Sequence, residues 1–553
     1  MKGNGTVKWL LNKSKGQRGN IALLIICNAL FSILTVGFAY IVKIVVDGAV
    51  NENKDLFVGG AIAIVVAIAL QFILRLVING LAEHIKGKLE IDFKTSLFSS
   101  ILKTKYSKIT EYHSGELMNR LTADVGVVAD GVSTIIPTVI ASVVRLVTAL
   151  VVLCFIDWTF AIALLVAGVL VFTVIALLRG KLKSLHKKVQ ETDGKTRSFM
   201  QEVIENVLAV KVFSSTKKAQ TLADKLQKDN FDVKMTRKNY SVFGTATYNF
   251  IFSAGYIFAL IFGGSKLLLG AVGFGYGDLS AILQLVNSIQ VPFASLSSIT
   301  PKYYATLASA ERLIEIENLE EDQTDCRVDS LETYNRLKKI VVDNVTFTYG
   351  DRDCVYKNAS IIFEKGQSVA ITGLSGVGKS TIMKLMLGVY PLEEGEIYLD
   401  CGEEKIPVGE NTRSLFSYVP QGNMLFSGTI RDNVTFIKED ATEEQINFAL
   451  KVSCADQFVD ALPDKLMTVV GENGTGLSEG QIQRLAIARA VLSGAPIMLL
   501  DEATGSLDAK TEEQVINNLL GLENTTVILV THRNQATIAC DKAIKVENKG
   551  FAV

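Results

Sequence analysis

Six long apolar segments lie in the first 300 residues of this 553-residue chain and limit what it can fold into. A helix needs about 20 apolar residues to cross the ~30 Å hydrocarbon layer of a bilayer. The first four segments are nearly uninterrupted, and the last two also contain Gly, Ser and Asn. We therefore predict six membrane-spanning helices, at approximately residues 20–47, 56–80, 133–156, 158–180, 242–269 and 278–300.

Lysine and arginine predict how these spans are oriented. Five basic residues and no acidic residue stand before the first span: Lys2, Lys8, Lys13, Lys15 and Arg18. The connections 83–108 and 179–238 are long and basic, whereas the connection 47–55 is short and acid-rich. Because basic connections stay in the cytosol, we predict a multi-pass protein with cytosolic N- and C-termini. The long connections keep a helical spacing, so the helices are expected to continue beyond the bilayer.

Four polar residues inside the predicted spans are candidates for the wall of a substrate cavity, because polar groups are costly in lipid. Gln284, Asn287 and Gln290 recur at intervals of three and share one helix face. Arg145 lies about twelve residues, or ~18 Å, from the outer end of its span. The alternatives are hydrogen bonds between helices for the amides, and snorkelling or a local ion pair for Arg145. Lys43 is nearer a span end, where we expect it to snorkel.

A glycine-rich loop in the second half predicts a phosphate-binding site. The sequence Gly373-Leu374-Ser375-Gly376-Val377-Gly378-Lys379-Ser380-Thr381 follows the apolar run 368–372 and precedes the helical pattern 382–387. A strand, a glycine-rich loop and a helix in this order form a P-loop, whose backbone N–H groups and helix N-terminus surround phosphate. We expect Lys379 to reach the β- and γ-phosphates and Ser380 to place its hydroxyl on Mg²⁺. The loop is therefore a candidate nucleotide site.

The residues around this loop have the pattern of a separate domain. A polar linker at 319–335 follows the membrane half at 1–318. From 336 to 553, short apolar strands alternate with helical patterns, which indicates a mixed α/β domain of ordinary size. The net charge of −1 offers no basic field for nucleic acid. We predict a six-helix transmembrane domain followed by an α/β P-loop nucleotide-binding domain.

Two carboxylates and a short loop extend the candidate nucleotide site. The apolar run 497–500 ends in Asp501, placed to hold Mg²⁺, and Glu502, placed to polarise the attacking water as a general base. The loop Leu477-Ser478-Glu479-Gly480-Gln481 lies about twenty residues before this apolar run and is followed directly by a helical pattern. With these motifs, the chain resembles the ATP-binding-cassette transporters of the exporter type, which fuse a membrane domain and a nucleotide domain in one chain. The resemblance extends over essentially the whole sequence.

The resemblance implies roles for further residues of the nucleotide domain. Tyr349 would stack on adenine, Gln421 would reach Mg²⁺, and His532 would contact the γ-phosphate. Together with Lys379 and Glu502, Gln421 and His532 would make up the catalytic set. Three residues of the signature loop would bind nucleotide held by a second cassette: Ser478, Gly480 and Gln481.

The resemblance also implies how the two domains communicate. Residues 112–121 resemble the segment around a first intracellular coupling helix, and residues 201–213 resemble the region before a second. Glu472 resembles a residue of the loop that touches these helices. Ser506-Leu507-Asp508 resembles the loop that crosses to the partner cassette.

One residue departs from the family pattern. The signature loop usually has Gly where this chain has Glu479. A carboxylate there would repel phosphate if it pointed into the site, or would complement the dipole of its own helix if it pointed out. Two alternatives follow: a homodimer with two working sites, or a heterodimer with a related half-transporter and one degenerate site.

The function that the resemblance implies is ATP-driven export by alternating access. Two bound ATP molecules would close the cassette dimer, and hydrolysis assisted by Glu502 would reopen it. A peptide, a drug or another amphipathic molecule would be the substrate, and a bacterial plasma membrane the location. A lipid flippase would carry the same motifs. An ATP-gated channel is a further alternative, but the chain shows no regulatory insertion and keeps Glu502.

Overall fold

The computed structural model describes residues 4–322, 328–350, 353–422, 425–471 and 474–552. Its internal contacts divide the chain into two compact units. The first unit contains Met1–Phe98 and Gly115–Glu317, and the second contains Ser99–Ser114 and Asn318–Val553. The second unit therefore includes part of the first intracellular connection, and each unit is described by itself.

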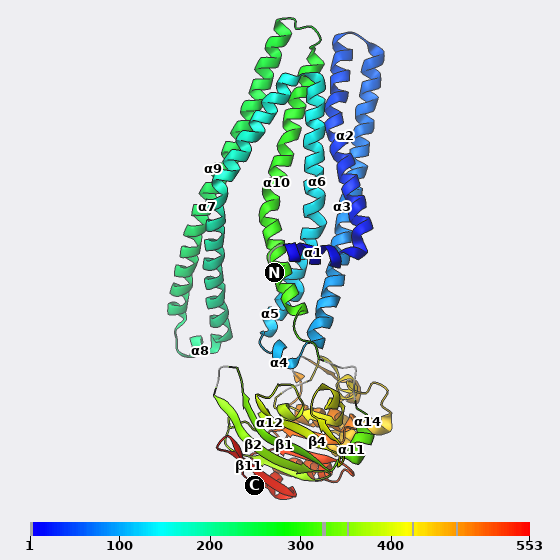
Figure 1. The fold of residues 1–553 in the computed structure, drawn as a ribbon, viewed down its shortest axis with the longest axis vertical. Helices are drawn as coiled ribbons and strands as arrows, with labels where there is room; N and C mark the ends of the chain where they lie inside the picture. Colours follow the sequence, from blue (N-terminus) through cyan, green and yellow to red (C-terminus); the bar gives the residue numbers. More distant parts are fainter. Residues whose placement is uncertain (1–3, 323–327, 351–352, 423–424, 472–473, 553) are drawn as a thin grey trace. The chain divides into compact units, whose positions relative to one another are not determined.

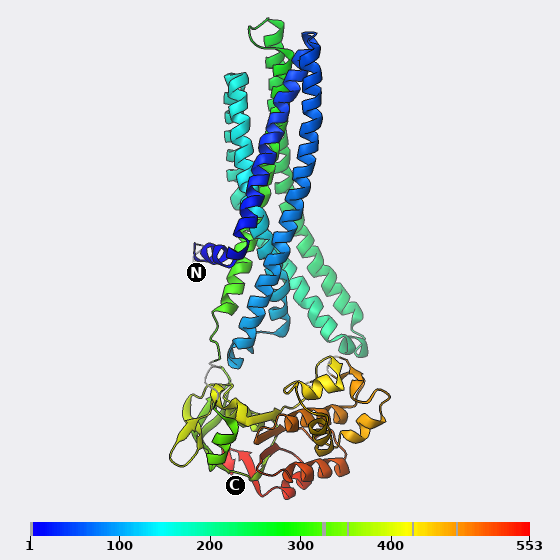
Figure 2. The same cartoon turned by 90° about the vertical axis from the view of Figure 1, so that its right-hand side faces the viewer.

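The first unit consists of long helices (Figures 1 and 2). The long helices are α2 (Arg18–Val50), α3 (Lys54–Lys103), α6 (Val125–Ile156), α7 (Trp158–Glu205), α9 (Thr216–Leu268) and α10 (Tyr276–Glu317). Shorter pieces are α1 (Asn4–Lys13), η1 (Lys15–Gln17), α5 (Ser114–Asn119), η2 (Arg120–Asp124) and α8 (Val207–Val212). In the described residues, five helical stretches are long and apolar enough to span a membrane: Lys15–Val50, Lys54–Lys103, Ser114–Ile156, Thr216–Leu268 and Tyr276–Glu317.

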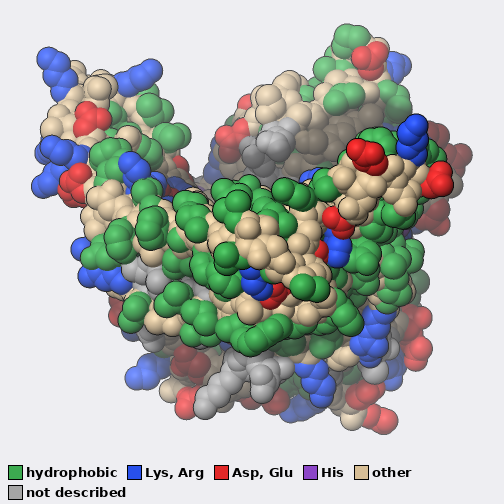
Figure 3. Space-filling model, turned by 90° about the horizontal axis from the view of Figure 1, so that it is seen from above, with side chains coloured by type: hydrophobic (Ala, Val, Ile, Leu, Met, Phe, Trp, Pro, Cys, Tyr) green, Lys and Arg blue, Asp and Glu red, His purple; other side chains and the backbone are tan. Residues whose placement is uncertain are grey.

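The remaining predicted span falls in α7. Its apolar stretch covers Trp158–Leu170 in the described part of the chain, and several side chains between residues 164 and 183 lie outside that part. Large apolar side chains such as Val65 and Phe72 are exposed on the helices. Figure 3, a view from above, also shows hydrophobic side chains over much of the face that it presents. This is the pattern of helices whose solvent is lipid.

Helices α2, α6, α9 and α10 enclose an apolar core. Ala149, Phe252, Ile282 and Leu285 are each at most 6% exposed within it. Small residues let the helices approach closely: an added Cβ on Gly131 would lie 2.1 Å from the hydroxyl oxygen of Thr306. Close packing through small residues is how helices associate in lipid, where hydrophobicity alone gives no preference for another helix.

Ion pairs join the helices where α2 ends and α10 begins. The Lys43 ammonium lies 2.6 Å from a carboxylate oxygen of Asp278, and Asp47 accepts a hydrogen bond of 3.0 Å from the Gly277 N–H group. Lys266 forms an ion pair with Asp157 at the start of α7. The sequence analysis expected Lys43 to snorkel toward its span end, and the fold adds a carboxylate partner there, from the start of α10.

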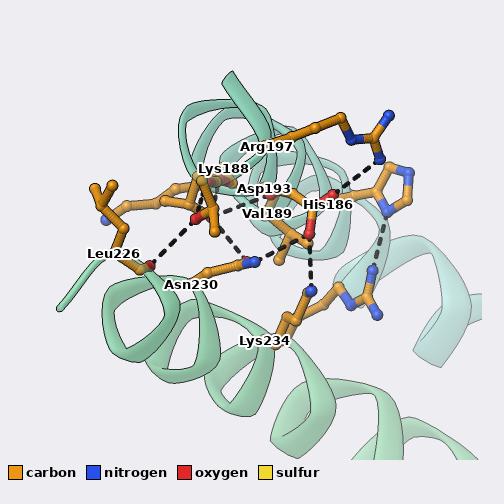
Figure 4. A network of polar contacts seen from close by, with 11 residues as sticks. His186, Lys188, Val189, Asp193, Arg197, Leu226, Asn230 and Lys234 are labelled. Carbon is orange, nitrogen blue, oxygen red and sulfur yellow. Dashed lines mark hydrogen bonds and ion pairs between the residues drawn. The ribbon is translucent and has the colours of Figure 1, made fainter. Parts of the chain in front are cut away.

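The intracellular part of α7 and α9 forms a hairpin with its own polar network (Figure 4). Asp193 accepts hydrogen bonds from Lys234 at 2.9 Å and from Asn230 at 3.0 Å, and these two donors lower the pKa of its carboxyl. Asn230 is 6% exposed and accepts a hydrogen bond of 3.1 Å from Thr192. His186 approaches Arg237 at 3.3 Å. The network fixes the register of the hairpin that carries α8.

In its described residues, the second unit contains three sheets. The strands are β1 (Lys339–Thr348), β2 (Cys354–Glu364), β3 (Ser368–Thr372), β4 (Glu394–Asp400), β5 (Lys405–Pro407), β6 (Phe416–Val419), β7 (Gly428–Thr429), β8 (Val469–Val470), β9 (Ile497–Asp501), β10 (Thr526–Val530), β11 (Lys542–Glu547) and β12 (Gly550–Ala552). An antiparallel sheet has the order β2-β1-β4-β5, a six-stranded sheet has the order β12-β11-β3-β10-β9-β6, and β7 pairs with β8. In the six-stranded sheet every pairing is parallel except that of β12 with β11.

Helices and buried strands place the polar loops of this unit at one edge. The helices are α4 (Tyr106–Ile109), α11 (Ser330–Arg336), α12 (Lys379–Met386), η3 (Glu410–Leu415), α13 (Ile430–Thr435), α14 (Glu443–Val452), α15 (Asp456–Ala461), η4 (Lys465–Met467), α16 (Glu479–Leu492), α17 (Ala509–Leu520) and α18 (Asn534–Ala539). Every residue of β9 and β10 is buried, as in a parallel strand covered on both faces. Loops that follow β3, β6, β9 and β10 therefore meet at the carboxyl edge of the sheet.

Candidate functional site

The glycine-rich loop between β3 and α12 has a conformation that needs its glycines. Gly373, Gly376 and Gly378 have φ values of +148°, +83° and +114°, where a side chain is strained. An added Cβ on Gly378 would also lie 2.6 Å from the side chain of Val355. Ser375 and Val377 occupy the positions between these glycines. The loop thus has the backbone geometry that the sequence predicted for a P-loop.

Lys379 is a buried cation at the start of α12. It is 5% exposed, and burial lowers the pKa of its amine. The amine donates hydrogen bonds of 3.1 Å to the carbonyl oxygen of Gly373 and 2.9 Å to that of Leu374. In the described structure no carboxylate forms an ion pair with it. A buried cation beside a helix N-terminus, held only by carbonyl oxygens, fits an incoming phosphate.

Asp501 is a buried carboxylate at the end of β9. It is 1% exposed, and burial raises the pKa of its carboxyl. It accepts hydrogen bonds of 2.8 Å from the hydroxyl of Ser380 and 3.2 Å from that of Tyr418. Both donors are neutral, so the oxygen-rich pair of Asp501 and Ser380 fits a divalent cation such as Mg²⁺. The sequence reasoning did not identify Tyr418, whose position beside Asp501 depends on the parallel pairing of β6 with β9.

Glu502 is held between two predicted catalytic residues. The side-chain amide of Gln421 donates to one of its carboxylate oxygens at 2.7 Å, and the Nε2 atom of His532 lies 2.9 Å from the other. Glu502 has φ = +51°, an uncommon conformation for a residue with a side chain. Strained residues of this kind cluster at functional sites. Gln421 binds Glu502 in this structure, and its role as a metal ligand stays a prediction.

Tyr349 links the P-loop to other aromatic rings. Its hydroxyl donates to Thr381 at 3.3 Å, and its ring makes an edge contact with Tyr390 at 5.2 Å between centroids. Tyr390 in turn makes an edge contact with Tyr106 of α4 at 5.7 Å. The sequence reasoning identified Tyr349 but missed Tyr390 and Tyr106, because nothing in the local pattern shows that these rings meet. Stacking of Tyr349 on adenine stays a prediction.

Helix α4 is tied to the beginning of the second unit's main segment. The Lys105 N–H group donates to the Glu320 carbonyl oxygen at 2.9 Å, and the Asp322 N–H group donates to the Lys103 carbonyl oxygen at 2.6 Å. The contact of Tyr106 with Tyr390 therefore belongs to a segment that the backbone itself holds in place.

The signature-loop residues lie at the N-terminus of α16. Ser478 and Gln481 form a capping box, in which each side chain bonds the other's backbone N–H group, at 3.3 and 2.8 Å. An added Cβ on Gly480 would lie 3.0 Å from the Ser506 carbonyl oxygen, a tight contact that glycine avoids. Glu479 lies in the first turn of α16 and is exposed. In the described structure no hydrogen bond joins Ser478, Gly480 or Gln481 to the glycine-rich loop of the same chain.

Two polar pairs around residues 504–508 were not found from the sequence. Gln483 and Ser506 exchange hydrogen bonds of 3.3 and 3.1 Å. Glu512, 1% exposed, accepts from Arg533 at 2.6 Å and from Thr504 at 2.8 Å. These contacts connect the predicted crossing loop to α16 and to the residue after His532. Glu472, predicted to face the coupling helices, lies outside the described residues.

The predicted cavity residues lie on α6 and α10. Arg145 is half-buried, and its Nε atom is buried without a hydrogen-bond partner. Gln290 donates to Asn249 at 3.3 Å, so one of the three amides bonds another helix. Gln284 is half-buried and Asn287 is exposed.

An ion pair between the two helices gives the depth of Arg145. Lys302 of α10 pairs with Asp130 of α6 at 2.6 Å, and the helices run in opposite directions. Arg145 is fifteen residues beyond Asp130, so it lies at about the level of Asn287, because both helices rise by 1.5 Å per residue.

Comparison with known proteins places the chain among described relatives. It matches the family "ABC transporter transmembrane region" over residues 20–293 and the family "ABC transporter" over residues 356–505. It is 26% identical over 548 residues to the ATP-dependent lipid A-core flippase of Syntrophus aciditrophicus, which covers 97% of this chain and 89% of the flippase. It is 30% identical over 455 residues to the ATP-dependent permease MDL1 of Candida albicans, which covers 80% of this chain and 65% of the permease. Its fold is similar to that of a bacterial Atm1-family ABC exporter with ATP bound, with a TM-score of 0.82 and 21% identity over 97% of this chain and 95% of that one.

Proposed function

Because this chain belongs to the ATP-binding-cassette transporters, as a half-transporter of the exporter type, we propose that two copies of it export an anionic amphipathic molecule. The chain is a multi-pass membrane protein that couples ATP hydrolysis to transport, and members of this family act as dimers. The proposal adds the identity of the partner, the charge of the substrate and the residues that bind and hydrolyse ATP.

The observation that carries the substrate class is Arg145. Its half-buried guanidinium lies in a predicted span, and its Nε atom has no hydrogen-bond partner. Along its own helix the nearest carboxylates are Asp130 and Asp157, ~22 and ~18 Å away, and each is already paired with a lysine. A charge in the membrane interior needs a counter-charge. We infer that an anionic group of the substrate supplies it.

The other helices support this inference. Between their ends, the predicted spans contain no Asp or Glu at all. Asn287 adds an exposed amide at about the same depth as Arg145. The relatives named as lipid A-core flippases make an anionic lipid the first candidate, and an acidic peptide is the second.

The residues of the nucleotide site divide the work of hydrolysis. Lys379 and the loop N–H groups would bind the phosphates of ATP, and Ser380 and Asp501, with Gln421, would hold Mg²⁺. The metal neutralises phosphate charge. Glu502, oriented by Gln421 and His532, accepts a proton from the attacking water. His532 then lies beside the transferred phosphate.

Two copies are needed because the site is incomplete in one chain. Ser478, Gly480 and Gln481 make no described hydrogen bond to the P-loop of their own chain, and N–H groups at the free end of α16 suit a phosphate from a second chain. Glu479 is exposed, which is compatible with a homodimer. A heterodimer with a related half-transporter is the alternative. The basic connections support cytosolic termini, and the bacterial relatives support a bacterial plasma membrane.

Reconstituted protein tests the proposed substrate class. Vesicles with the purified chain would be scored for ATP-driven movement of a fluorescent anionic lipid, phosphatidylglycerol, and of zwitterionic phosphatidylcholine with the same label. We expect preference for the anionic lipid, a loss of about tenfold or more in Arg145→Gln, and retention in Arg145→Lys. Equal transport of the two lipids, or an Arg145→Gln variant that keeps the preference, would contradict an anionic substrate. Acidic peptides would be compared in the same vesicles.

A further inference from the structure

Helix α1 is clamped to the two helices through which the chain leaves the first unit. The Trp9 ring stacks on Phe93 of α3, with 5.8 Å between centroids and 17° between planes. The Trp9 Nε1 group donates to Glu317 at 3.0 Å. Glu317 is the last residue of α10, and the first unit ends there.

A second set of contacts completes this clamp. The Lys13 ammonium lies 2.8 Å from the other carboxylate oxygen of Glu317 and donates to the Ser96 hydroxyl at 2.8 Å. Ser96 also donates to Glu317 at 3.2 Å. Ser96 lies two residues before Phe98, where α3 passes into the second unit. Helix α1 therefore contacts both places where the chain leaves the first unit, after Phe98 and after Glu317, and its own orientation is fixed by four polar and aromatic contacts.

Three other basic side chains of segment 4–18 take no part in this clamp, and Arg18 donates to the Leu11 carbonyl oxygen at 3.1 Å. Lys8, Lys15 and Arg18 are exposed, and in the described residues no carboxylate forms an ion pair with any of them. The described segment 4–18 contains no acidic residue. Leu11, 47% exposed, lies between these cations. The segment thus has a free edge that combines positive charge with an apolar side chain.

The position of Lys8, Lys15, Arg18 and Leu11 at the start of the first span indicates which molecules they contact. Arg18 begins α2, the first membrane-spanning helix, and Figures 1 and 2 show α1 lying across the long helices rather than along them. A short helix that lies across the start of a span is at the bilayer surface. Basic side chains there attract anionic lipids, at ~1 kcal/mol per Lys or Arg, and an apolar side chain adds contact with the acyl boundary.

We propose that Lys8, Lys15 and Arg18 form a binding surface for anionic phospholipid headgroups, and that this contact makes ATPase activity depend on the anionic lipid content of the bilayer. The headgroups would hold α1 in place, and α1 would hold Ser96 and Glu317 near the two places where the chain leaves the first unit. The proposal rests on the cytosolic N-terminus proposed above, but not on the identity of the substrate.

Trp9 reports on the lipids next to α1. The chain has two tryptophans, so Trp158→Phe leaves Trp9 as the only one. The full-length chain in nanodiscs would be titrated with brominated phosphatidylglycerol or brominated phosphatidylcholine, which quench nearby tryptophan. We expect quenching by the anionic lipid to be at least about twofold greater. The combined variant Lys8→Gln, Lys15→Gln, Arg18→Gln should quench equally with both lipids, whereas Lys8→Arg, Lys15→Arg, Arg18→Lys should keep the preference.

A matched variant controls for lost charge. Lys217, Lys225 and Lys228 are exposed on α9, and changing all three to Gln removes the same charge away from α1. This control should keep the anionic preference. Equal quenching by the two lipids in the parent protein, or a preference that survives in the Lys8, Lys15, Arg18 variant, would overturn the proposed surface. Quenching requires no ATP hydrolysis, so this result is independent of the proposed function.

The same nanodiscs test the second half of the proposal. ATPase activity should rise severalfold with phosphatidylglycerol in the parent protein and stay flat in the Lys8, Lys15, Arg18 variant. Glu317→Gln should keep the lipid preference of Trp9 quenching but lose most of the ATPase response. Activity that is independent of phosphatidylglycerol in the parent protein, or an unchanged response in Glu317→Gln, would overturn the regulatory role.

Discussion

At the scale of single residues, Glu502 is the group on which hydrolysis is proposed to depend. It follows a strand that is buried at every position, has a left-handed backbone conformation, and is hydrogen-bonded on both carboxylate oxygens. Gln421 and His532 thus fix where its negative charge lies. A positioned general base typically contributes 10²–10⁴-fold to a rate.

The substitution Glu502→Gln should lower the ATPase kcat by about 100-fold or more and leave ATP binding nearly unchanged. The amide keeps the size of the side chain but cannot accept a proton. The measurement is steady-state hydrolysis together with binding of a fluorescent ATP analogue. Glu513→Gln, on the exposed side of α17, removes one charge without touching the site and should behave like the parent protein. A Glu502→Gln variant within threefold of the parent rate would show that another group acts as the base.

At the scale of elements, the aromatic chain connects α4 to the P-loop. Tyr106, Tyr390 and Tyr349 make successive edge contacts, and the Tyr349 hydroxyl bonds Thr381. Each aromatic pair adds ~0.5–1.5 kcal/mol beyond its buried area. A shift of α4 should therefore move the ring of Tyr349, which is predicted to stack on adenine.

Removing the ring of Tyr390 should uncouple α4 from the P-loop. We expect Tyr390→Leu to weaken ATP binding by roughly 2–10-fold, the equivalent of losing its pair with Tyr349. The loss of its pair with Tyr106 should reduce the stimulation of hydrolysis by transported substrate. Tyr390→Phe keeps the ring and should behave like the parent protein. The measurement is the dependence of ATPase rate on ATP concentration, with and without substrate. If Tyr390→Leu and Tyr390→Phe gave equal values, the ring contacts would not contribute to coupling.

At the scale of the whole molecule, the signature loop decides between homodimer and heterodimer. Glu479 lies in the first turn of α16, and Ser478 caps that helix. In a homodimer, both nucleotide sites would have this carboxylate near phosphate, and like charges repel. Each site would then hydrolyse ATP, but at a lower rate than a site with glycine at position 479.

The chain alone, purified in nanodiscs, should hydrolyse ATP, and Glu479→Gly should raise the rate severalfold. Glu479→Gln, which removes the charge and keeps the side chain, should give most of that gain, and the gain should shrink at high salt because screening weakens repulsion. Binding of ATP without hydrolysis, in the parent and in both variants, would instead indicate that a different chain supplies the second signature loop.

The sequence by itself determined the features that depend on neighbouring residues. Long apolar runs predicted spanning helices because lipid accepts only segments that satisfy their own backbone hydrogen bonds. The loop from Gly373 to Thr381 predicted its own conformation because glycines permit positive φ. The apolar run before Asp501 and Glu502 predicted these two carboxylates as site residues, and the family resemblance added His532.

Only the tertiary structure decided which distant side chains meet. Tyr418 reaches Asp501 because β6 lies beside β9, and Gln421 reaches Glu502 for the same reason. Lys43 finds Asp278, and Tyr106 finds Tyr390, across hundreds of residues of chain. A local sequence pattern indicates whether a segment is a helix or a strand and which backbone conformations its residues allow. Strand order and helix packing come from the burial of whole faces, and a single pair of residues carries no local signal of that choice.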